Sequence, residues 1–237
     1  MEQLTAPLLV VSPHLDDAVL SCGELLAQYP GSSVVTVFAG TPAAGEMLTQ
    51  WDAACGFVSA AQAMQLRRDE DAAALRLVSA WPRRLDFLDG QYGPSPAVAE
   101  IRDALGAVVR ALRPSTICFP AGLFHTDHAL VHRAAMALRD QRGAGQRGGN
   151  TGPGERWVMY EDALYRRHPA LLQRCLAHLH AAGIAVTPLA APSDHSRASK
   201  RNAVACYASQ LRGLLTVANG HADAFAPEGY WHLECAP

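Results

Sequence analysis

Three side chains capable of metal-binding or acid–base chemistry lie close together near the start of the chain: His14, Asp16 and Asp17. They follow a short apolar run at residues 8–11 and precede apolar positions with helical spacing at residues 17–28. We therefore expect them in a loop between a strand and a helix. An imidazole and two carboxylates in one loop suit a divalent metal ion. Because consecutive side chains point in different directions, one aspartate can bind the metal while the other faces the attacking water.

A second cluster follows another apolar run, residues 116–119, and contains His125 and His128. The carboxyl ends of parallel strands meet at one edge of a sheet, so both clusters can converge on one crevice. His14, Asp17 and His128 then offer two imidazoles and one carboxylate, the pattern of a catalytic zinc site with an open position. We expect one Zn²⁺ per chain, although Fe²⁺ or Co²⁺ would also suit these donors. His125 is expected at the rim as a proton donor.

Two alternatives compete with this metal site. Asp16 or Asp17 could simply cap the helix that follows them, which is a common use of aspartate. His128 and His132, four residues apart, could instead bind zinc from one face of a helix. We favour the first set, because the histidine pair lacks the glutamate of the HExxH motif and His132 lies one turn farther from the crevice.

The elements that must position these residues alternate between strands and helices. Strands are predicted at residues 8–11, 34–38, 85–88, 116–119, 157–160 and 184–186, and helices at 17–28, 59–79, 97–112, 127–139, 169–182 and 196–211. This order predicts an α/β fold, a single Rossmann-like three-layer domain over residues 1–237 with a mostly parallel sheet. The loop after the first strand lacks the GxGxxG of dinucleotide-binding proteins, which argues against such a cofactor.

One segment interrupts the alternation. Six of the 19 glycines fall between residues 143 and 154, so we predict a flexible, glycine-rich loop at about residues 142–156. A surface insertion is the favoured interpretation, with an active-site lid as the alternative.

Composition argues against several classes of function. The 20 basic and 22 acidic residues give a net charge of −2 without a basic stripe, so nucleic acid is not an expected partner. Lys200 is the only lysine, which excludes a P-loop lysine and leaves a single candidate for imine chemistry. No membrane span or secretory signal is expected, and the scattered cysteines fit reduced thiols. We therefore expect a cytoplasmic protein, with homo-oligomerisation left open.

The two clusters, in this order, resemble the paired motifs of the PIG-L/LmbE-like deacetylases, zinc-dependent hydrolases that remove acyl groups, usually acetyl, from amino sugars. The first motif, usually HPDDE, reads His14-Leu15-Asp16-Asp17-Ala18, and the second, usually HPDH or HxDH, reads His125-Thr126-Asp127-His128. The resemblance extends from about residue 8 to residue 233. It implies that His14, Asp17 and His128 bind zinc and that Asp16 is the general base.

The resemblance also implies roles for residues between and beside the motifs. Arg67 lies in a segment similar to the RxxE helix of the family and Asp89 in its DG segment, and both would contact the sugar. Without the resemblance, Arg67 is typical of a solvated helix surface and Asp89 of a turn. His125, in protonated form, would stabilise the tetrahedral intermediate. Leu123 stands where the branch acting on a mycothiol precursor has tyrosine, which favours another amino-sugar substrate.

Together these features predict a hydrolase that removes the N-acetyl group from an amino sugar or glycoconjugate by means of zinc-activated water. One alternative is an amidase that cleaves a larger acyl group or a thiol conjugate at the same site. Another is a non-catalytic module that binds a sugar or a metal.

Overall fold

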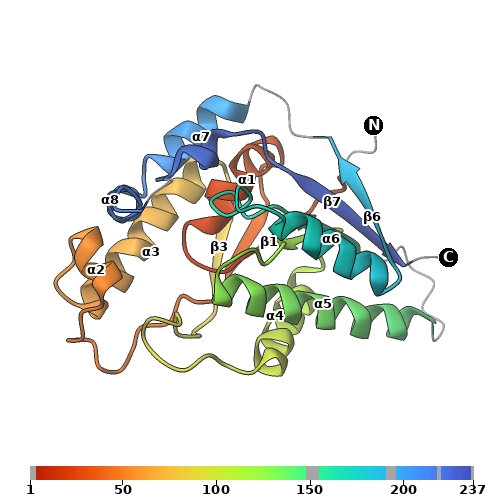
Figure 1. Ribbon diagram of the computed structural model, residues 1–237, viewed down its shortest axis with the longest axis horizontal. Coiled ribbons are helices and arrows are strands. Elements are labelled where there is room, and N and C mark those ends of the chain that lie inside the picture. Colours follow the sequence, from red (N-terminus) through yellow and green to blue (C-terminus); the bar gives the residue numbers. More distant parts are fainter. Residues whose placement is uncertain (1–3, 148–154, 191–195, 218–219, 236–237) are drawn as a thin grey trace.

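A seven-stranded sheet forms the centre of the molecule (Figure 1), in the order β3-β2-β1-β4-β5-β7-β6. The computed structural model describes residues 4–147, 155–190, 196–217 and 220–235. Neighbouring strands from β3 to β5 are parallel, whereas β7 runs antiparallel to both β5 and β6. The strands are β1 (Leu8–Ser12), β2 (Ser33–Thr36), β3 (Trp81–Arg84), β4 (Thr116–Pro120), β5 (Arg156–Tyr160), β6 (Ile184–Leu189) and β7 (Tyr230–Cys235). The predicted α/β fold with a mostly parallel sheet is therefore confirmed.

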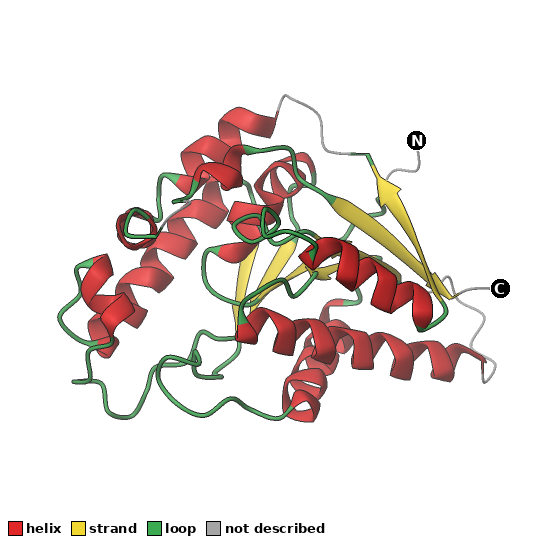
Figure 2. Cartoon of the chain, in the orientation of Figure 1, coloured by secondary structure: helices red, strands yellow, loops and turns green. Residues whose placement is uncertain are grey.

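Helices cover both faces of the sheet and give the three expected layers (Figure 2). The side chains of a strand alternate between its two faces, and along β1 Val10 enters one apolar core while Val11 enters the other. The first core includes residues of α1, α3 and α7, and the second includes residues of α4, α5 and α6. The helices are α1 (Asp17–Gln28), α2 (Gln50–Cys55), α3 (Ala60–Leu77), α4 (Val98–Leu112), α5 (Thr126–Arg147), α6 (Leu171–Ala181), α7 (Arg197–Val204) and α8 (Ala208–Leu214), followed by a short 3₁₀ helix, η2 (Ala222–Phe225).

The strand order places a topological switch point between β1 and β4. The chain leaves β1 toward β2 on one side and later returns to β4 on the other. In open parallel sheets, such a point opens a crevice at the carboxyl ends of the two strands, and ligands bind there. Both sequence clusters follow these two strands, so the fold brings them to this edge.

The third predicted strand was wrong in position. It was expected at residues 85–88, but β3 is Trp81–Arg84, and residues 85–88 hold only an isolated bridge between Phe38 and Asp86. β3 is an edge strand with mostly exposed side chains, so it lacks the apolar run that marks a buried strand. Its proline is tolerated because an edge strand needs fewer ladder hydrogen bonds.

Helix boundaries also differ from the prediction. The helix expected at residues 196–211 is two helices, α7 and α8, which are separated at residues 205–207. Helix α5 continues to Arg147, through glycines that were expected to begin a loop at residue 142. Residues 148–154 of that predicted loop lie outside the described residues. No pattern in the sequence predicts α2 or β7. Within the described part of the chain, no helix is long and apolar enough to cross a membrane.

Candidate metal centre

The first cluster is held in a tight turn between β1 and α1. Ser12, the last residue of β1, donates its hydroxyl to the His14 carbonyl at 2.6 Å and accepts the Ala18 N–H at 2.9 Å. The His14 N–H in turn donates to Asp17 Oδ2 at 2.9 Å. These bonds close the loop on itself and fix the directions of the His14 and Asp17 side chains.

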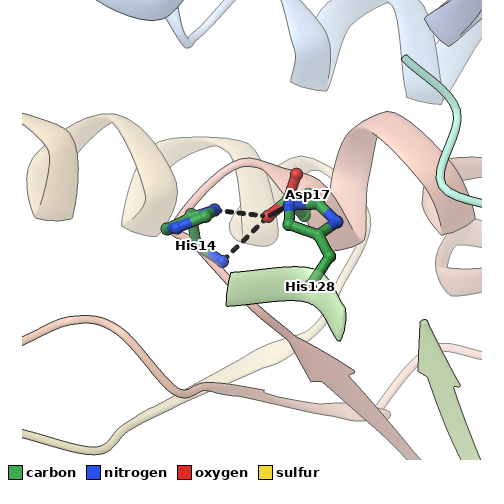
Figure 3. A group of neighbouring side chains, drawn as sticks. All are labelled: His14, Asp17 and His128. Atoms are coloured by element: carbon green, nitrogen blue, oxygen red, sulfur yellow. Dashed lines mark hydrogen bonds and ion pairs between the residues drawn. The ribbon is translucent and has the colours of Figure 1, made fainter. Parts of the chain in front are cut away.

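The structure brings His14, Asp17 and His128 together in a buried group, with the two imidazole rings converging on Asp17 (Figure 3). Asp17 Oδ2 lies 3.0 Å from His14 Nδ1 and 3.1 Å from His128 Nε2. One ligand atom from each side chain lies within 4.8 Å of the other two, a spacing that could hold a metal ion. Two imidazoles and one carboxylate are the donor set of an open catalytic zinc site.

The outward ring nitrogens of both histidines face carboxylates. His14 Nε2 lies 3.1 Å from Asp127 Oδ2, and His128 Nδ1 lies 2.6 Å from Asp162 Oδ1. Histidines that bind metals usually donate their other N–H to such a group, which fixes the tautomer and the ring orientation. With protons on those two nitrogens, His14 Nδ1 and His128 Nε2 present lone pairs toward Asp17.

Neither Asp127 nor Asp162 has a role predicted from the sequence. Asp127 belongs to the second motif, and it also accepts the Gly90 N–H at 3.0 Å. A Cβ at Gly90 would lie 2.9 Å from Asp127 Oδ1, so glycine permits this close approach. Asp162 follows β5 in the chain, and only the tertiary structure brings it to His128.

Two observations show that the group fits a metal ion. His128 Nε2 is buried and has no hydrogen-bond partner among the described residues, although Asp17 lies beside it. Burying a polar nitrogen without a hydrogen-bond partner destabilises the folded protein unless a ligand interacts with it. The surrounding carboxylates also outnumber the permanent cations near them, which favours a bound cation.

The pKa shifts express the same excess of negative charge. Burial by itself would lower the pKa of His14, but Asp89, Asp127 and Asp17 outweigh it and raise that pKa well above its usual value. Burial likewise opposes protonation of His128, yet Asp17 and Asp162 raise its pKa to about 9. The pKa of Asp17 falls well below its usual value, because the two imidazoles outweigh burial.

Asp16 stands at the start of α1 without capping it. It occupies the N-cap position, but its side chain makes no capping hydrogen bond, so the capping alternative does not explain its carboxylate. Burial and the neighbouring charge of Asp17 raise the pKa of Asp16 to about 6, even though Arg67 and His14 act in the opposite direction. A carboxyl group with a pKa near the working pH can both accept and return a proton.

His125 lies half-buried beside the group, with its ring 5.2 Å from that of His14 and 5.4 Å from that of His128. Burial and these two neighbouring histidines lower its pKa, so the neutral ring is favoured over the protonated form that we expected. The Asp127 N–H donates to His125 Nδ1 at 3.2 Å, which places the ring proton on Nε2. His125 can therefore donate a hydrogen bond without carrying a charge.

Arg67 and Asp89 lie at the same site. Arg67 is only 3% exposed, so the solvated-surface interpretation is wrong. Its Nη1 lies 3.4 Å from Asp89 Oδ2, and that oxygen is 3.9 Å from His14 Nε2. Asp89 also accepts hydrogen bonds from the backbone and side chain of Gln91. Arg67 Nε is buried without a hydrogen-bond partner among the described residues.

The alternative pair of His128 and His132 receives no support from the geometry. His132 Nδ1 bonds the Pro120 carbonyl at 2.9 Å, and no candidate metal group in the described part of the chain contains His132. A second candidate group does exist and consists of His14, His125 and Asp127. It shares His14 with the first group and engages the ring nitrogen that already faces Asp127.

These features define an α/β protein with a candidate metal centre at the switch point of its sheet. A family model described as PIG-L, GlcNAc-PI de-N-acetylase, matches residues 9–139, and the chain belongs to this family. The matched region contains every residue of the candidate site named above except Asp162.

Solved structures with the same fold include several deacetylases. The chain is 26% identical to the A40926 pseudoaglycone deacetylase Dbv21, with a TM-score of 0.75 over 97% of this chain and 98% of that one. It is 23% identical to the zinc-inhibited form of teicoplanin deacetylase Orf2, with a TM-score of 0.76 over 96% and 97% of the two chains. N,N'-diacetylchitobiose deacetylase from Pyrococcus horikoshii is 18% identical, with a TM-score of 0.56 over 86% and 70%. No curated protein sequence matches the chain at a significant level.

Proposed function

We propose that this protein is a metal-dependent N-deacetylase that hydrolyses the N-acetyl group of an amino sugar or glycoconjugate, with Zn²⁺ as the expected metal. Membership of the PIG-L family, and structural similarity to proteins named as deacetylases, support this reaction. The observation that carries the proposal is the buried group of His14, Asp17 and His128, in which a second carboxylate backs each histidine.

His14 Nδ1, Asp17 Oδ2 and His128 Nε2 are the atoms that would hold the metal. When bound there, Zn²⁺ supplies Lewis acidity, which lowers the pKa of water and polarises a carbonyl oxygen. Asp127 and Asp162 keep the two rings in the tautomer and orientation that this binding requires.

Asp16 is the proposed general base. Its carboxylate accepts a proton from the attacking water, whose oxygen forms a bond to the carbonyl carbon of the amide. The same carboxyl group then returns the proton to the nitrogen as the C–N bond breaks, so the products are acetate and the free amine. The raised pKa of Asp16, about 6, suits both transfers.

Two further parts of the site complete the reaction. His125 donates its Nε2–H to the oxyanion that develops on the amide oxygen, and its neutral ring needs no extra proton to do so. Arg67 and Asp89 offer a donor and an acceptor for the hydroxyl groups of the sugar. Interactions with this non-reacting part of the substrate orient the amide over the metal group.

The test combines metal analysis with an amide-hydrolysis assay. Purified protein is incubated with Zn²⁺, desalted and analysed for bound metal, and amine release is measured on a panel of N-acetylated amino sugars and oligosaccharides. We expect about one metal per chain and amine release in the native protein. His14→Ala should lose both the metal and the activity.

His132→Ala is the matched control, because His132 is a partly buried histidine one helical turn beyond His128. It should keep the metal and most of the activity. Full metal content in His14→Ala, or metal loss in His132→Ala alone, would contradict the proposed centre. A native protein that binds metal but hydrolyses no member of the panel would instead support the non-catalytic module.

A further inference from the structure

Phe124 occupies a strained turn directly before His125. The His125 N–H donates to the Leu123 carbonyl at 2.7 Å, and Phe124 between them has a φ of +62°. These features define a γ-turn with a left-handed central residue, a rare and strained conformation. Glycine adopts it at much lower cost than a residue with a large side chain.

The phenyl ring of Phe124 is also 65% exposed, so it is not retained for core packing. A large apolar side chain on a strained backbone disfavours the folded state in two ways, through strain and through exposure to water. Such a combination at the edge of a catalytic site indicates a residue kept for contact with a ligand.

The turn is fixed relative to the metal centre by Asp162. One oxygen of this carboxylate accepts the Leu123 N–H at 2.9 Å, while the other faces His128 Nδ1 at 2.6 Å. The same side chain therefore holds a proposed metal ligand and the turn that presents Phe124. The backbone of the turn therefore cannot shift far without disturbing one of these bonds.

Two further rings join Phe124 to form an aromatic wall, defined here as Phe124, Tyr165 and His168. Phe124 stacks on His168 with ring centroids 4.3 Å apart and planes within 3° of parallel. The Tyr165 ring lies 5.5 Å from Phe124 and 5.2 Å from His128. The wall thus extends from the metal centre to the exposed surface. None of these three residues has a function predicted from the sequence.

Arg67 and Asp89 on one hand, and the aromatic wall on the other, lie next to different histidines of the metal centre. Asp89, with Arg67 behind it, approaches His14 at Nε2, whereas the aromatic wall approaches through the rings of His128 and His125. A secondary amide is planar and trans, so its acyl chain and its nitrogen substituent point in opposite directions. When the sugar lies at Arg67 and Asp89, the acyl group points away from them.

We propose that the aromatic wall is an acyl-binding subsite, and that the enzyme also hydrolyses N-acyl amino sugars whose acyl chain is longer than acetyl. This inference rests on the proposed function, because it uses the orientation of the amide in that reaction. An acetyl methyl group is too short to reach from the metal centre across Tyr165 to Phe124. A hexanoyl chain adds four methylene groups, and each methylene that packs against the wall strengthens binding.

The test compares N-hexanoyl-glucosamine with N-acetyl-glucosamine through the ratio of their kcat/KM values. The native enzyme should hydrolyse the hexanoyl substrate at least as efficiently as the acetyl one. In Phe124→Gly, which removes the ring and relieves the strained backbone, the ratio should fall about tenfold, equivalent to about 1.4 kcal/mol. Phe124→Ala removes the ring but keeps the strain, so the same fall there would assign the effect to the ring.

Trp81→Ala is the matched control. Trp81 is an aromatic residue with nearly the same exposure as Phe124, 64% against 65%, but it lies on the edge strand β3. The ratio should not change in this variant. An unchanged ratio in both Phe124 variants would overturn the proposal, as would equal losses on the two substrates, which would place the sugar on the wall.

A binding measurement separates this inference from the proposed function. Saturation-transfer NMR records the binding of hexanoate to the native protein, to Phe124→Gly and to Trp81→Ala. A hexanoate signal that is lost only in Phe124→Gly would support the acyl subsite even if no amide were hydrolysed, a result that would contradict the proposed function alone. Equal signals in all three proteins would overturn the subsite.

Discussion

Two buried clusters of charge in this molecule differ in one respect, the number of polar atoms left without a partner. In the first, Lys200 Nζ donates to Glu228 Oε1 at 2.7 Å, and this oxygen also accepts the Glu24 N–H. Glu228 Oε2 accepts the Leu25 N–H at 3.1 Å and the Tyr230 hydroxyl at 2.6 Å. The cluster therefore pairs one cation with one anion and saturates both carboxylate oxygens.

The second cluster, at the candidate metal centre, is not saturated with hydrogen-bond partners. His128 Nε2 and Asp127 Oδ1 are buried without a hydrogen-bond partner among the described residues. Five carboxylates surround two imidazoles and one guanidinium: those of Asp16, Asp17, Asp89, Asp127 and Asp162. An incomplete set of donors together with surplus negative charge leaves room for a cation, which the first cluster does not.

The first cluster, Lys200 with Glu228, is called the closed cluster here. It supplies hydrogen-bond acceptors where α1 is interrupted. Backbone angles at Cys22 leave the helical range, with φ at −132°, and the break frees the N–H groups that Glu228 accepts. The Lys200 stem crosses Gly23 so closely that a Cβ there would lie 2.7 Å from Lys200 Cγ. The only lysine of the chain thus serves the fold, and the carboxylate that holds it argues against imine chemistry. Burial of charge therefore does not by itself mark a functional site.

Substitutions in the two clusters should have different effects, and the largest is expected on catalysis, at Asp16. Asp16→Asn removes the proposed base and leaves the metal-binding atoms in place, so kcat should fall by about 10³-fold or more. Metal analysis of the same preparation should still find the metal at the native level. Near-native activity in this variant would mean that another group accepts the proton.

The next effect is on stability, at the closed cluster. Lys200→Met leaves the Glu228 charge buried without its cation and should lower the free energy of unfolding by about 3–5 kcal/mol. Urea denaturation measures this loss, and Lys200→Met combined with Glu228→Gln should recover part of it. Metal content of the folded protein should stay native, and a selective loss of metal would contradict the separation of the two clusters.

A smaller effect is expected where a carboxylate backs a metal ligand. Asp162→Asn weakens the hold on the His128 Nδ1 proton and should reduce Zn²⁺ affinity by about 10- to 100-fold. Titration against a competing chelator gives the affinity. Asp52→Asn is the control, because Asp52 is equally buried and accepts the Tyr92 hydroxyl but belongs to no candidate metal group. Equal losses in both variants would indicate a general disturbance of the fold.

The smallest effect is that of a change of one pH unit. The pKa of His128 is about 9 without metal, so a proton must leave the ring before Zn²⁺ can bind at any pH below that value. Apparent affinity should therefore weaken as pH falls, by about tenfold per unit between pH 8 and 6 for each proton displaced. Chelator competition at pH 6, 7 and 8 measures the slope. An affinity that is independent of pH would mean that His128 binds no metal.

Local patterns predicted the buried parallel strands of the sheet most accurately. The apolar runs of β1, β4 and β5 were found because buried parallel strands are apolar throughout. β3 was misplaced, since an exposed edge strand has no such pattern. β7 was missed because its place between β5 and β6 depends on a long-range antiparallel pairing.

The sequence by itself determined which residues could form the centre, because His14, Asp17 and His128 stand beside strand ends that a parallel sheet must bring to one edge. Only the tertiary structure decided their partners. Asp162 reaches His128 across 34 positions of the chain, and Lys200 reaches Glu228 across 28. Motif spacing reports the side chains that a short segment presents, whereas hydrogen-bond satisfaction depends on which distant groups the packed core places within about 3 Å. That is why Asp127 and Asp162, the protonation state of His125 and the aromatic wall emerged only from the folded molecule.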